Sequence, residues 1–230
     1  MKVKVEKRIF KKFEGFHLGV LLVNNVENKG SDKKIFSLLN DVENFIQLNY
    51  AFENIAKANT ISSWRTAFED LDQEPKKFHC SVERMMRSIL KGRKIKHNNK
   101  LDDVINYVAL KNVIPIAGYD LKNLHNLTLG FAKKSQSFKD VSNSKSRTKK
   151  NEVILFDKNG VISRKWNWKK SINAKITTTT SGAVILVDAL PPVTRSSLQK
   201  VLNELSDTIK MFCGGTIKQA ILSEKQTSLK

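Results

Sequence analysis

The chain has little cysteine and no long apolar run, and each absence excludes a class of protein. Its 230 residues contain two cysteines, Cys80 and Cys213. Two distant cysteines without a CxxC or Cys/His spacing indicate neither a disulfide scaffold nor a zinc site, which fits a reducing cytoplasm. The early apolar run Gly19 to Val23 has the length of a strand and is far shorter than the ~20 residues that cross a membrane. The N-terminal MKVKVEKRIFKKF alternates charged and apolar residues, so no signal peptide is expected.

The sequence also lacks the motifs of nucleotide-dependent and covalent catalysis. It contains no Walker loop, dinucleotide fingerprint or GxSxG element, and its histidines form no Ser/His/Asp or Cys/His pattern. Cys213 precedes two glycines near an expected helix end, where a cysteine is more often a small packed residue than a nucleophile. An enzyme built on this chain is therefore expected to need neither a metal nor an organic cofactor.

Acidic residues are in the minority, and this imbalance indicates the partner. The chain has 41 lysines and arginines against 22 aspartates and glutamates, a formal net charge of +19. A positive field of this size attracts phosphate backbones whatever their sequence and makes binding strongly salt-dependent. Nucleic acid is the expected partner, and the alternative is an ordinary basic protein with a solvated lysine surface.

The hydrophobic pattern predicts an α+β fold of layered mixed sheets with flanking helices. Apolar spacing predicts a buried strand over 16–26, helices over 35–56, 64–71, 81–90 (with Ser81 as N-cap) and 198–212, and strands over 127–132, 152–156, 161–168 and 183–187. We expect one compact domain over residues 1–222, with a helical lobe at about 1–100 and a sheet-rich lobe at about 101–222. Residues 223–230 are expected to form a frayed tail.

Residues 102–121 contain a polar stripe within a segment that otherwise has the pattern of a core helix. Asp103 and Asn106 lie three residues apart and share one helix face among apolar positions. Pro115 then ends the helix, and Gly118 is expected in a tight turn. An unsatisfied buried polar group costs about 1–3 kcal/mol. The stripe therefore either braces the fold or contacts a ligand.

Basic residues cluster on both sides of this stripe in the sequence. The connection before the stripe contains Lys91, Arg93, Lys94 and Lys96. The Ser/Lys-rich insert at 133–151, which follows it, contains Lys149 and Lys150. The low hydrophobicity of the insert predicts that it stays mobile on its own. It is either a loop that grips RNA or a solvated hairpin tip.

The segment ISRKWNWKK combines aromatic and polar residues. If this segment is a strand, its side chains alternate between two faces. One face would contain Ile162, Arg164, Trp166 and Trp168. The opposite face would contain Ser163, Lys165, Asn167 and Lys169. The tryptophans either stack on an exposed base, which contributes about 1–3 kcal/mol, or fill the core against Arg164. In the second case Asn167 and Lys169 still face a groove.

Several motifs occur in an order that resembles a known family. DVINYVALKNVIPIAGYD resembles the tRNA-binding and editing domain in the β subunit of bacterial phenylalanyl-tRNA synthetase, and the chain is still more similar to the freestanding relatives of that domain. The matching pieces run in order from about residue 60 to 215. They are Trp64, Ser81 to Glu83 with Arg87 and Lys91-Gly92, Asn99 to Asn106, Gly118 to Asp120, Trp166 to Trp168, Asp188 to Pro192, and Cys213 to Gly215.

The resemblance implies hydrolysis of a wrongly attached amino acid from tRNA, carried out in trans in the cytoplasm. An aminoacyl ester is already reactive, so such a site chiefly positions a water and stabilises an oxyanion. The resemblance implies catalytic roles for Asn106, Asp103 and Asn99. It implies substrate-binding roles for Arg87, Asp120, Arg164, Trp166, Asn167, Trp168 and Lys169, and tRNA-binding roles for Lys91, Arg93, Lys94, Lys96, Lys149 and Lys150. The alternative is a non-catalytic tRNA- or RNA-binding module of the same fold.

The chain departs from the synthetase domain at three places. Ala117 stands where that domain has histidine, Ile105 stands where it has threonine, and NWKKS replaces a Gly-Gly-acidic segment, which supplies Lys169 and Lys170. Tyrosine specificity is therefore not implied. Some freestanding relatives that resemble this chain are deacylases for tRNA that carries another near-cognate amino acid. One such amino acid is the arginine analogue canavanine. The amino acid, the tRNA and the oligomeric state stay open.

Overall fold

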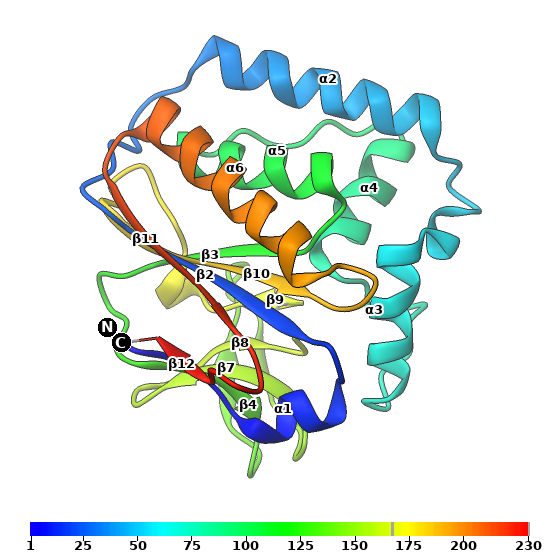
Figure 1. Cartoon of the computed structure of the whole chain (residues 1–230), viewed down its shortest axis with the longest axis vertical. Helices are drawn as coiled ribbons and strands as arrows, with labels where there is room; N and C mark the ends of the chain where they lie inside the picture. Colours follow the sequence, from blue (N-terminus) through cyan, green and yellow to red (C-terminus); the bar gives the residue numbers. More distant parts are fainter. Residues whose placement is uncertain (167, 230) are drawn as a thin grey trace.

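A computed structural model describes residues 1–166 and 168–229 and arranges them in layers (Figure 1). Within these residues a central antiparallel sheet has the strand order β11 (Thr216–Leu222), β2 (His17–Asn24), β10 (Gly182–Ala189), β3 (Ile116–Asp120). An outer mixed sheet has the order β12 (Ser228–Leu229), β1 (Val3–Val5), β4 (Leu127–Phe131), β7 (Val153–Asp157), β8 (Gly160–Arg164), β9 (Lys169–Lys170). The α+β class is confirmed.

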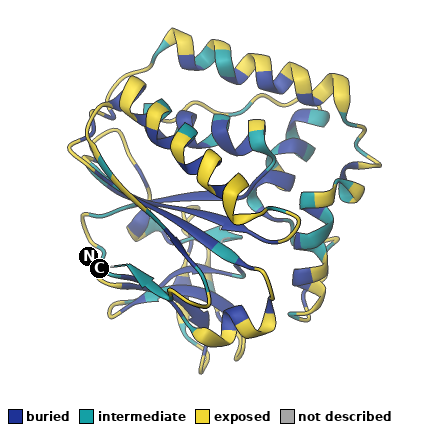
Figure 2. Ribbon diagram, viewed as in Figure 1, coloured by how far each residue is buried: buried dark blue, intermediate teal, exposed yellow. Residues whose placement is uncertain are grey.

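Helices cover one face of the central sheet. The helices are α1 (Lys7–Lys12), α2 (Lys33–Asn49), α3 (Asn59–Glu69), α4 (Ser81–Leu90), α5 (Lys100–Asn112) and α6 (Arg195–Cys213), with short 3-10 turns at Ile55–Lys57 and Ile172–Ala174. Helices α5 and α6 pack on the sheet and α2 lies outside α5 (Figure 1). Their inner sides are buried, while the outer sides of α2 and α6 are exposed (Figure 2). No helix in the described part of the chain is long and apolar enough to span a membrane.

The central strands β2 and β10 are buried on both faces. Alternate residues such as Leu21 and Ile185 pack with α5 and α6, whereas Val20 and Leu186 belong to the core shared with the outer sheet. Alternation on a strand thus sends neighbouring residues into two different cores. This is why both strands have continuous apolar sequences, and the predicted strands over 16–26 and 183–187 are confirmed.

Three local predictions about helices and turns are wrong. Helix α2 ends at Asn49 rather than near residue 56. At this end the Asn49 side chain donates to the Phe45 carbonyl oxygen, and the backbone of Tyr50 is extended. Cys80, not Ser81, is the N-cap of α4, and Ser81 is its first helical residue. Gly118 lies inside β3, where a Cβ would come within 2.6–2.7 Å of Ile176 and Ile105. Glycine is therefore present for close packing, not for a turn.

The strand predicted over 161–168 ends at Arg164. Lys165 and Trp166 have φ values of 48° and 47°, a left-handed conformation that cannot continue a strand. The chain turns here and returns as β9. The alternating faces expected through Lys169 are therefore not formed.

The two halves of the chain are interleaved rather than separate. Strands β1 and β2 from the first hundred residues join sheets built mostly from the second half. Residues 223–229, expected as a frayed tail, form a turn and the strand β12, which pairs with β1, and Val5 donates its N–H to the Thr227 carbonyl oxygen at 2.9 Å. Both ends of the described chain are thus joined in one sheet.

The insert at 133–151, for which a hairpin was one of the two expected alternatives, forms a hairpin of β5 (Ser137–Lys139) and β6 (Lys145–Arg147). Phe138 is buried under it, and Asp140 accepts hydrogen bonds from the backbone N–H groups of Ser142 and Ser144 at the turn. Lys169 Nζ lies 2.6 Å from the other oxygen of Asp140. The hairpin is therefore anchored to the outer sheet.

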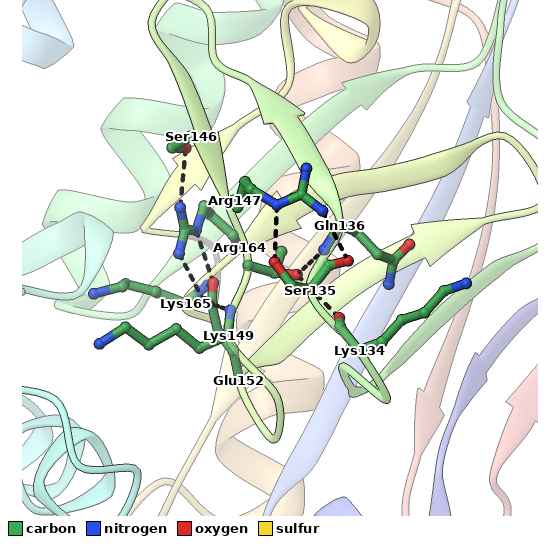
Figure 3. A network of polar contacts seen from close by, with 10 residues as sticks. Lys134, Ser135, Gln136, Ser146, Arg147, Lys149, Glu152, Arg164 and Lys165 are labelled. Carbon is green, nitrogen blue, oxygen red and sulfur yellow. Dashed lines mark hydrogen bonds and ion pairs between the residues drawn. The ribbon is translucent and has the colours of Figure 1, made fainter.

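A buried ion pair connects this insert to the turn after β8 (Figure 3). Arg164 donates to both carboxylate oxygens of Glu152 at 2.8 and 2.7 Å, and to Ser146 Oγ at 2.9 Å. Glu152 also accepts the backbone N–H groups of Lys149 and Lys165, each at 3.0 Å. Every strong hydrogen-bonding direction of this carboxylate is used.

We predict that Arg164→Met lowers the free energy of unfolding by about 3–5 kcal/mol, because it leaves the Glu152 carboxylate buried without its counter-charge. The Glu152→Met/Arg164→Met double variant should lose less than the sum of the two single variants. Urea denaturation followed by circular dichroism measures both. A loss below about 1 kcal/mol in Arg164→Met would contradict a stabilising pair.

Candidate functional site

The start of α5 is fixed by a cap rather than left open for chemistry. Asn99 is the N-cap: its Oδ1 accepts the Asp102 N–H and its Nδ2 donates to Asp102 Oδ2, both at 2.9 Å. The N–H of Leu101 donates to Oδ1 of the buried Asn28 at 2.7 Å. Asn99, predicted to be catalytic, thus satisfies one free N–H group of the first turn, that of Asp102, and orients the Asp102 side chain.

Asp103 is a buried carboxyl group paired with a histidine. Its Oδ2 lies 3.4 Å from Nδ1 of His97, and the His97 side chain is 40% exposed. Its Oδ1 is buried without a hydrogen-bond partner among the described residues. Burial raises the pKa of Asp103 to about 6, against the opposing effect of His97. This carboxyl can therefore exchange a proton near neutral pH.

A lysine from β9 faces the same end of α5. The Lys170 ammonium donates to the Gly118 carbonyl oxygen at 3.2 Å and lies 5.5 Å from the centre of the Tyr119 ring. Desolvation lowers the pKa of Lys170 while Asp102 opposes that shift, and burial raises the pKa of Asp102 while Lys170 opposes it. Lys170 and Asp102 are therefore desolvated groups of opposite charge that interact electrostatically, without an ion pair between them among the described residues.

Asn106 lies one turn after Asp102 on the same face of α5. Its side chain is half-exposed, and its amide makes no hydrogen bond to the part of the chain that the structure describes. The amide has donors and an acceptor for a bound molecule. We refer to Asn99, Asp102, Asp103, Asn106 and Lys170 as the α5 polar cluster. It can orient a water and place positive charge beside a carbonyl oxygen.

Other predicted substrate-binding side chains are held by protein partners. Arg87 donates to Glu83 Oε1 at 2.8 Å and covers the Phe52 ring, and Arg164 is bound to Glu152. Asp120 accepts from the Thr180 hydroxyl and the Lys122 N–H. The structure does not bring these three side chains into the α5 polar cluster.

The two tryptophans have different surroundings. Trp166 is 2% exposed, donates its indole N–H to Asp188 Oδ1 at 3.1 Å, and meets the ring of Trp64 edge-on. This is the core-filling alternative, although its neighbours are aromatic residues rather than Arg164. Trp168 is half-exposed, packs edge-on against Phe78 at 4.8 Å, and keeps surface for a ligand. Its carbonyl oxygen accepts from Arg84.

The remaining predicted site residues are Asn167 and Lys169. Asn167 lies outside the described residues. Lys169 is bound to Asp140, which holds the pKa of that carboxyl below its usual range. Lys169 therefore holds the hairpin, and its ammonium lies 5.0 Å from the Trp168 ring.

The predicted tRNA-binding residues fall into two groups. Lys94 pairs with Glu43 on α2, and Lys91 lies over the Phe52 ring. Lys149 and Lys150 line a hollow of about 650 Å³ near α1. Figure 1 places α2 and α1 at opposite ends of the molecule. Exposed Arg93 and Lys96 belong to the first group by sequence.

Sequence reasoning missed two sets of residues. The electrostatic interaction between Asp102 and Lys170 was not recognised, although both residues lie in segments already singled out, because the approach of a strand to a helix is not visible in one sequence. The basic residues of α1 that share the hollow, Arg8, Lys11 and Lys12, recur at helical spacing. That spacing is the one signal that could have identified them.

Comparisons with known proteins place the chain in a family. Residues 63–214 match the model of the B3/4 domain. The chain is 22% identical over 220 residues to the uncharacterized protein YhzB of Bacillus subtilis (strain 168), covering 94% of this chain and 97% of that protein. A structure comparison finds an N-terminal fragment of the phenylalanyl-tRNA synthetase β subunit from Pyrococcus horikoshii, with a TM-score of 0.46 and 12% identity. The alignment covers 94% of this chain, which spans about half (49%) of that fragment.

The family match extends over well more than half of the chain and includes α3 to α6. It agrees with the resemblance that the ordered motifs indicate. The chain belongs to the B3/4 domain family, which includes a module of the phenylalanyl-tRNA synthetase β subunit.

Proposed function

We propose that this chain is a trans-editing aminoacyl-tRNA deacylase. It hydrolyses the ester that joins a tRNA to a wrongly attached near-cognate or non-protein amino acid. The observation that carries the proposal is the α5 polar cluster, where the amide of Asn106, which makes no hydrogen bond to the described residues, lies one turn from Asp102, whose carboxylate interacts electrostatically with the desolvated Lys170. Family membership and the net charge of +19 support an RNA substrate.

The proposed reaction needs no covalent intermediate. Asn106 orients the ester or the attacking water, and the Lys170 ammonium stabilises the oxyanion that forms on the ester carbonyl. The Asp103–His97 pair takes up the proton of the water and returns it to the departing ribose oxygen. The His97 side chain is 40% exposed, so it can exchange a proton with solvent, and its Nδ1 lies 3.4 Å from Asp103 Oδ2.

The basic residues of the chain bind the tRNA in this proposal. Lys91, Arg93 and Lys96 are exposed or half-exposed at the connection into α5, so they can contact phosphates close to the α5 polar cluster. Lys149 and Lys150 offer a second contact at the other end of the molecule. Separate contacts of this kind fix the orientation of a large nucleic acid.

A non-catalytic tRNA-binding module is the second candidate. It is favoured by the packing of Ala117 in the core and by the use of Asn99 as a helix cap. This module would bind tRNA with the same salt dependence and leave the ester intact. Hydrolysis therefore separates the two functions, whereas binding does not.

We predict that Asn106→Ala lowers the deacylation rate by about 10²–10³-fold, because one positioning hydrogen bond is lost, with unchanged affinity for uncharged tRNA. A panel of mischarged tRNAs with labelled amino acids measures the rate. Asn112→Ala is the matched control, because Asn112 lies on α5 but bonds to Val108 and Glu204. Full activity of Asn106→Ala would count against the site, and no hydrolysis by the wild type would favour the binding module.

We predict a pH dependence that Lys170 controls. The oxyanion needs the protonated lysine, so the rate, corrected for spontaneous ester hydrolysis, falls as pH rises through the pKa of Lys170, which desolvation holds below the ordinary range of a lysine. Lys170→Met should lose about 10²-fold in rate together with this alkaline fall. Lys170→Arg should keep part of the rate and move the fall to higher pH. An unchanged profile in Lys170→Met would exclude the role.

A further inference from the structure

The hollow near α1 is a second candidate site. Its basic wall consists of Arg8, Lys11 and Lys12 from α1 and of Lys149, Lys150 and Lys165 from the ends of β6 and β8. Its volume is about 650 Å³, within the usual range for small-molecule sites. None of the α5 polar cluster lines it, so it is separate from the proposed deacylation site.

The cations of this wall have no acidic partner within ion-pair distance among the described residues. The neighbouring cations Arg164 and Lys169 both have acidic partners. The lack of such partners therefore distinguishes the cations of the basic wall from cations close to them. Lys165 is held by its left-handed backbone and by the hydrogen bond to Glu152, and its Nζ lies 3.2 Å from the centre of the Phe78 ring. Desolvation, with smaller contributions from Arg164 and Lys149, lowers its pKa to about 8.

Like charges gathered in one place repel one another, and a bound anion relieves that repulsion. Figure 3 shows Lys149 and Lys165 extending the same way from the Glu152–Arg164 pair. The carboxylate of Glu152 is bound by Arg164 and forms no ion pair with either lysine among the described residues, although its charge opposes the lowering of the Lys165 pKa. The basic wall is therefore suited to phosphate.

Another part of the lining offers hydrogen-bond acceptors. It consists of Asp70, Leu71, Asp72 and Gln73, which follow α3. Gln73 is 7% exposed, and its Oε1 is buried without a partner in the described part of the chain. A buried acceptor without a donor costs about 1–3 kcal/mol. A ligand that carried only negative charge would be repelled by Asp70 and Asp72, so the complete ligand needs donor groups as well.

We propose that this hollow binds a phosphorylated ribose. The phosphate lies against the basic wall, and the ribose hydroxyls donate to Gln73 Oε1 and to the carboxylates of Asp70 and Asp72. Carboxylates accept hydrogen bonds from ribose hydroxyls in other nucleotide sites for the same reason. Phe131, with Arg8 5.0 Å above its ring, supplies an apolar surface for the sugar or base. The ribose belongs either to a phosphorylated RNA end or to a free nucleotide.

Calorimetric titration of the full chain with adenosine 5′-monophosphate tests the site. We expect saturable binding that Lys149→Gln/Lys150→Gln weakens by about tenfold or more, since two phosphate-facing charges are lost. Lys200→Gln/Lys210→Gln removes two exposed lysines from α6 and is the matched control, with unchanged affinity. Absence of binding, or equal weakening by both double variants, overturns the proposal.

Gln73→Leu tests the acceptor wall. We expect the wild type to bind adenosine 5′-monophosphate more tightly than its 2′-deoxy form, and Gln73→Leu to lose that preference. The variant should be as stable as the wild type or more so, because it removes an unsatisfied buried oxygen. Preference retained in Gln73→Leu overturns the assignment of the hydroxyls.

A short RNA with a 5′-phosphate, compared with the same RNA with a 5′-hydroxyl, distinguishes the two sources of the ribose. Tighter binding of the 5′-phosphate RNA than of the 5′-hydroxyl RNA, by a margin that Lys149→Gln/Lys150→Gln removes, identifies an RNA end. Equal binding of the two RNAs beside saturable binding of adenosine 5′-monophosphate identifies a free nucleotide. All these ligands lack an aminoacyl ester. Failure of the deacylase proposal therefore leaves this test intact, and failure here leaves the deacylase proposal intact.

Discussion

The burial of β2 and β10 on both faces is the constraint on which the rest of the structure depends. One face packs against α5 and α6 and the other against the outer sheet and Trp166. The central sheet therefore separates a helical core from a core that it shares with the outer sheet. One candidate site lies beside each of these cores. The α5 polar cluster lies at the edge of the helical core. The hollow near α1 lies beside the outer sheet, at the far end of the ion pair between Arg164 and Glu152.

Polar groups in this fold divide into those that are satisfied and those that are not. Arg164 with Glu152 and Asn99 with Asp102 use their hydrogen-bonding capacity within the protein. Asp103 Oδ1 and Gln73 Oε1 are buried acceptors without a partner among the described residues. Natural proteins leave few such atoms, so each one requires an explanation. Five buried side-chain atoms make no hydrogen bond within the described residues, and three of them belong to Glu43, Ser81 and Glu83. The other two, Asp103 Oδ1 and Gln73 Oε1, lie at the two places where we propose that ligands bind.

The sequence pattern predicted the helices and strands that are determined by their own residues. The apolar run in β10 and the helical spacing in α6 predicted those elements within a few residues of their observed bounds. The sequence pattern gave a wrong prediction where contacts with residues distant in the sequence determine the backbone conformation. Lys165 and Trp166 adopt left-handed backbone because Trp166 is drawn into a core of Phe13, Phe16 and Trp64. Such contacts are not encoded in the neighbouring residues.

The candidate sites show the same limit. Asn106 and Asp103 were predicted as neighbours because helix geometry places them on one face. Lys170 joins them only through the return of the chain after β8, and Gln73 meets Lys149 only when α3 and the insert fold against each other. Arg87, in contrast, had the right sequence context but is occupied by Glu83. A motif identifies a residue, and the fold decides whether its side chain is free.

The pairing of β12 with β1 brings the two described ends of the chain side by side (Figure 1). A unit whose ends leave at one point can be inserted into a loop of a larger protein without stretching either connection. It can also be rearranged so that its termini lie elsewhere while the strand order stays the same. The short strand β12 thus suits this fold to insertion into proteins of different length.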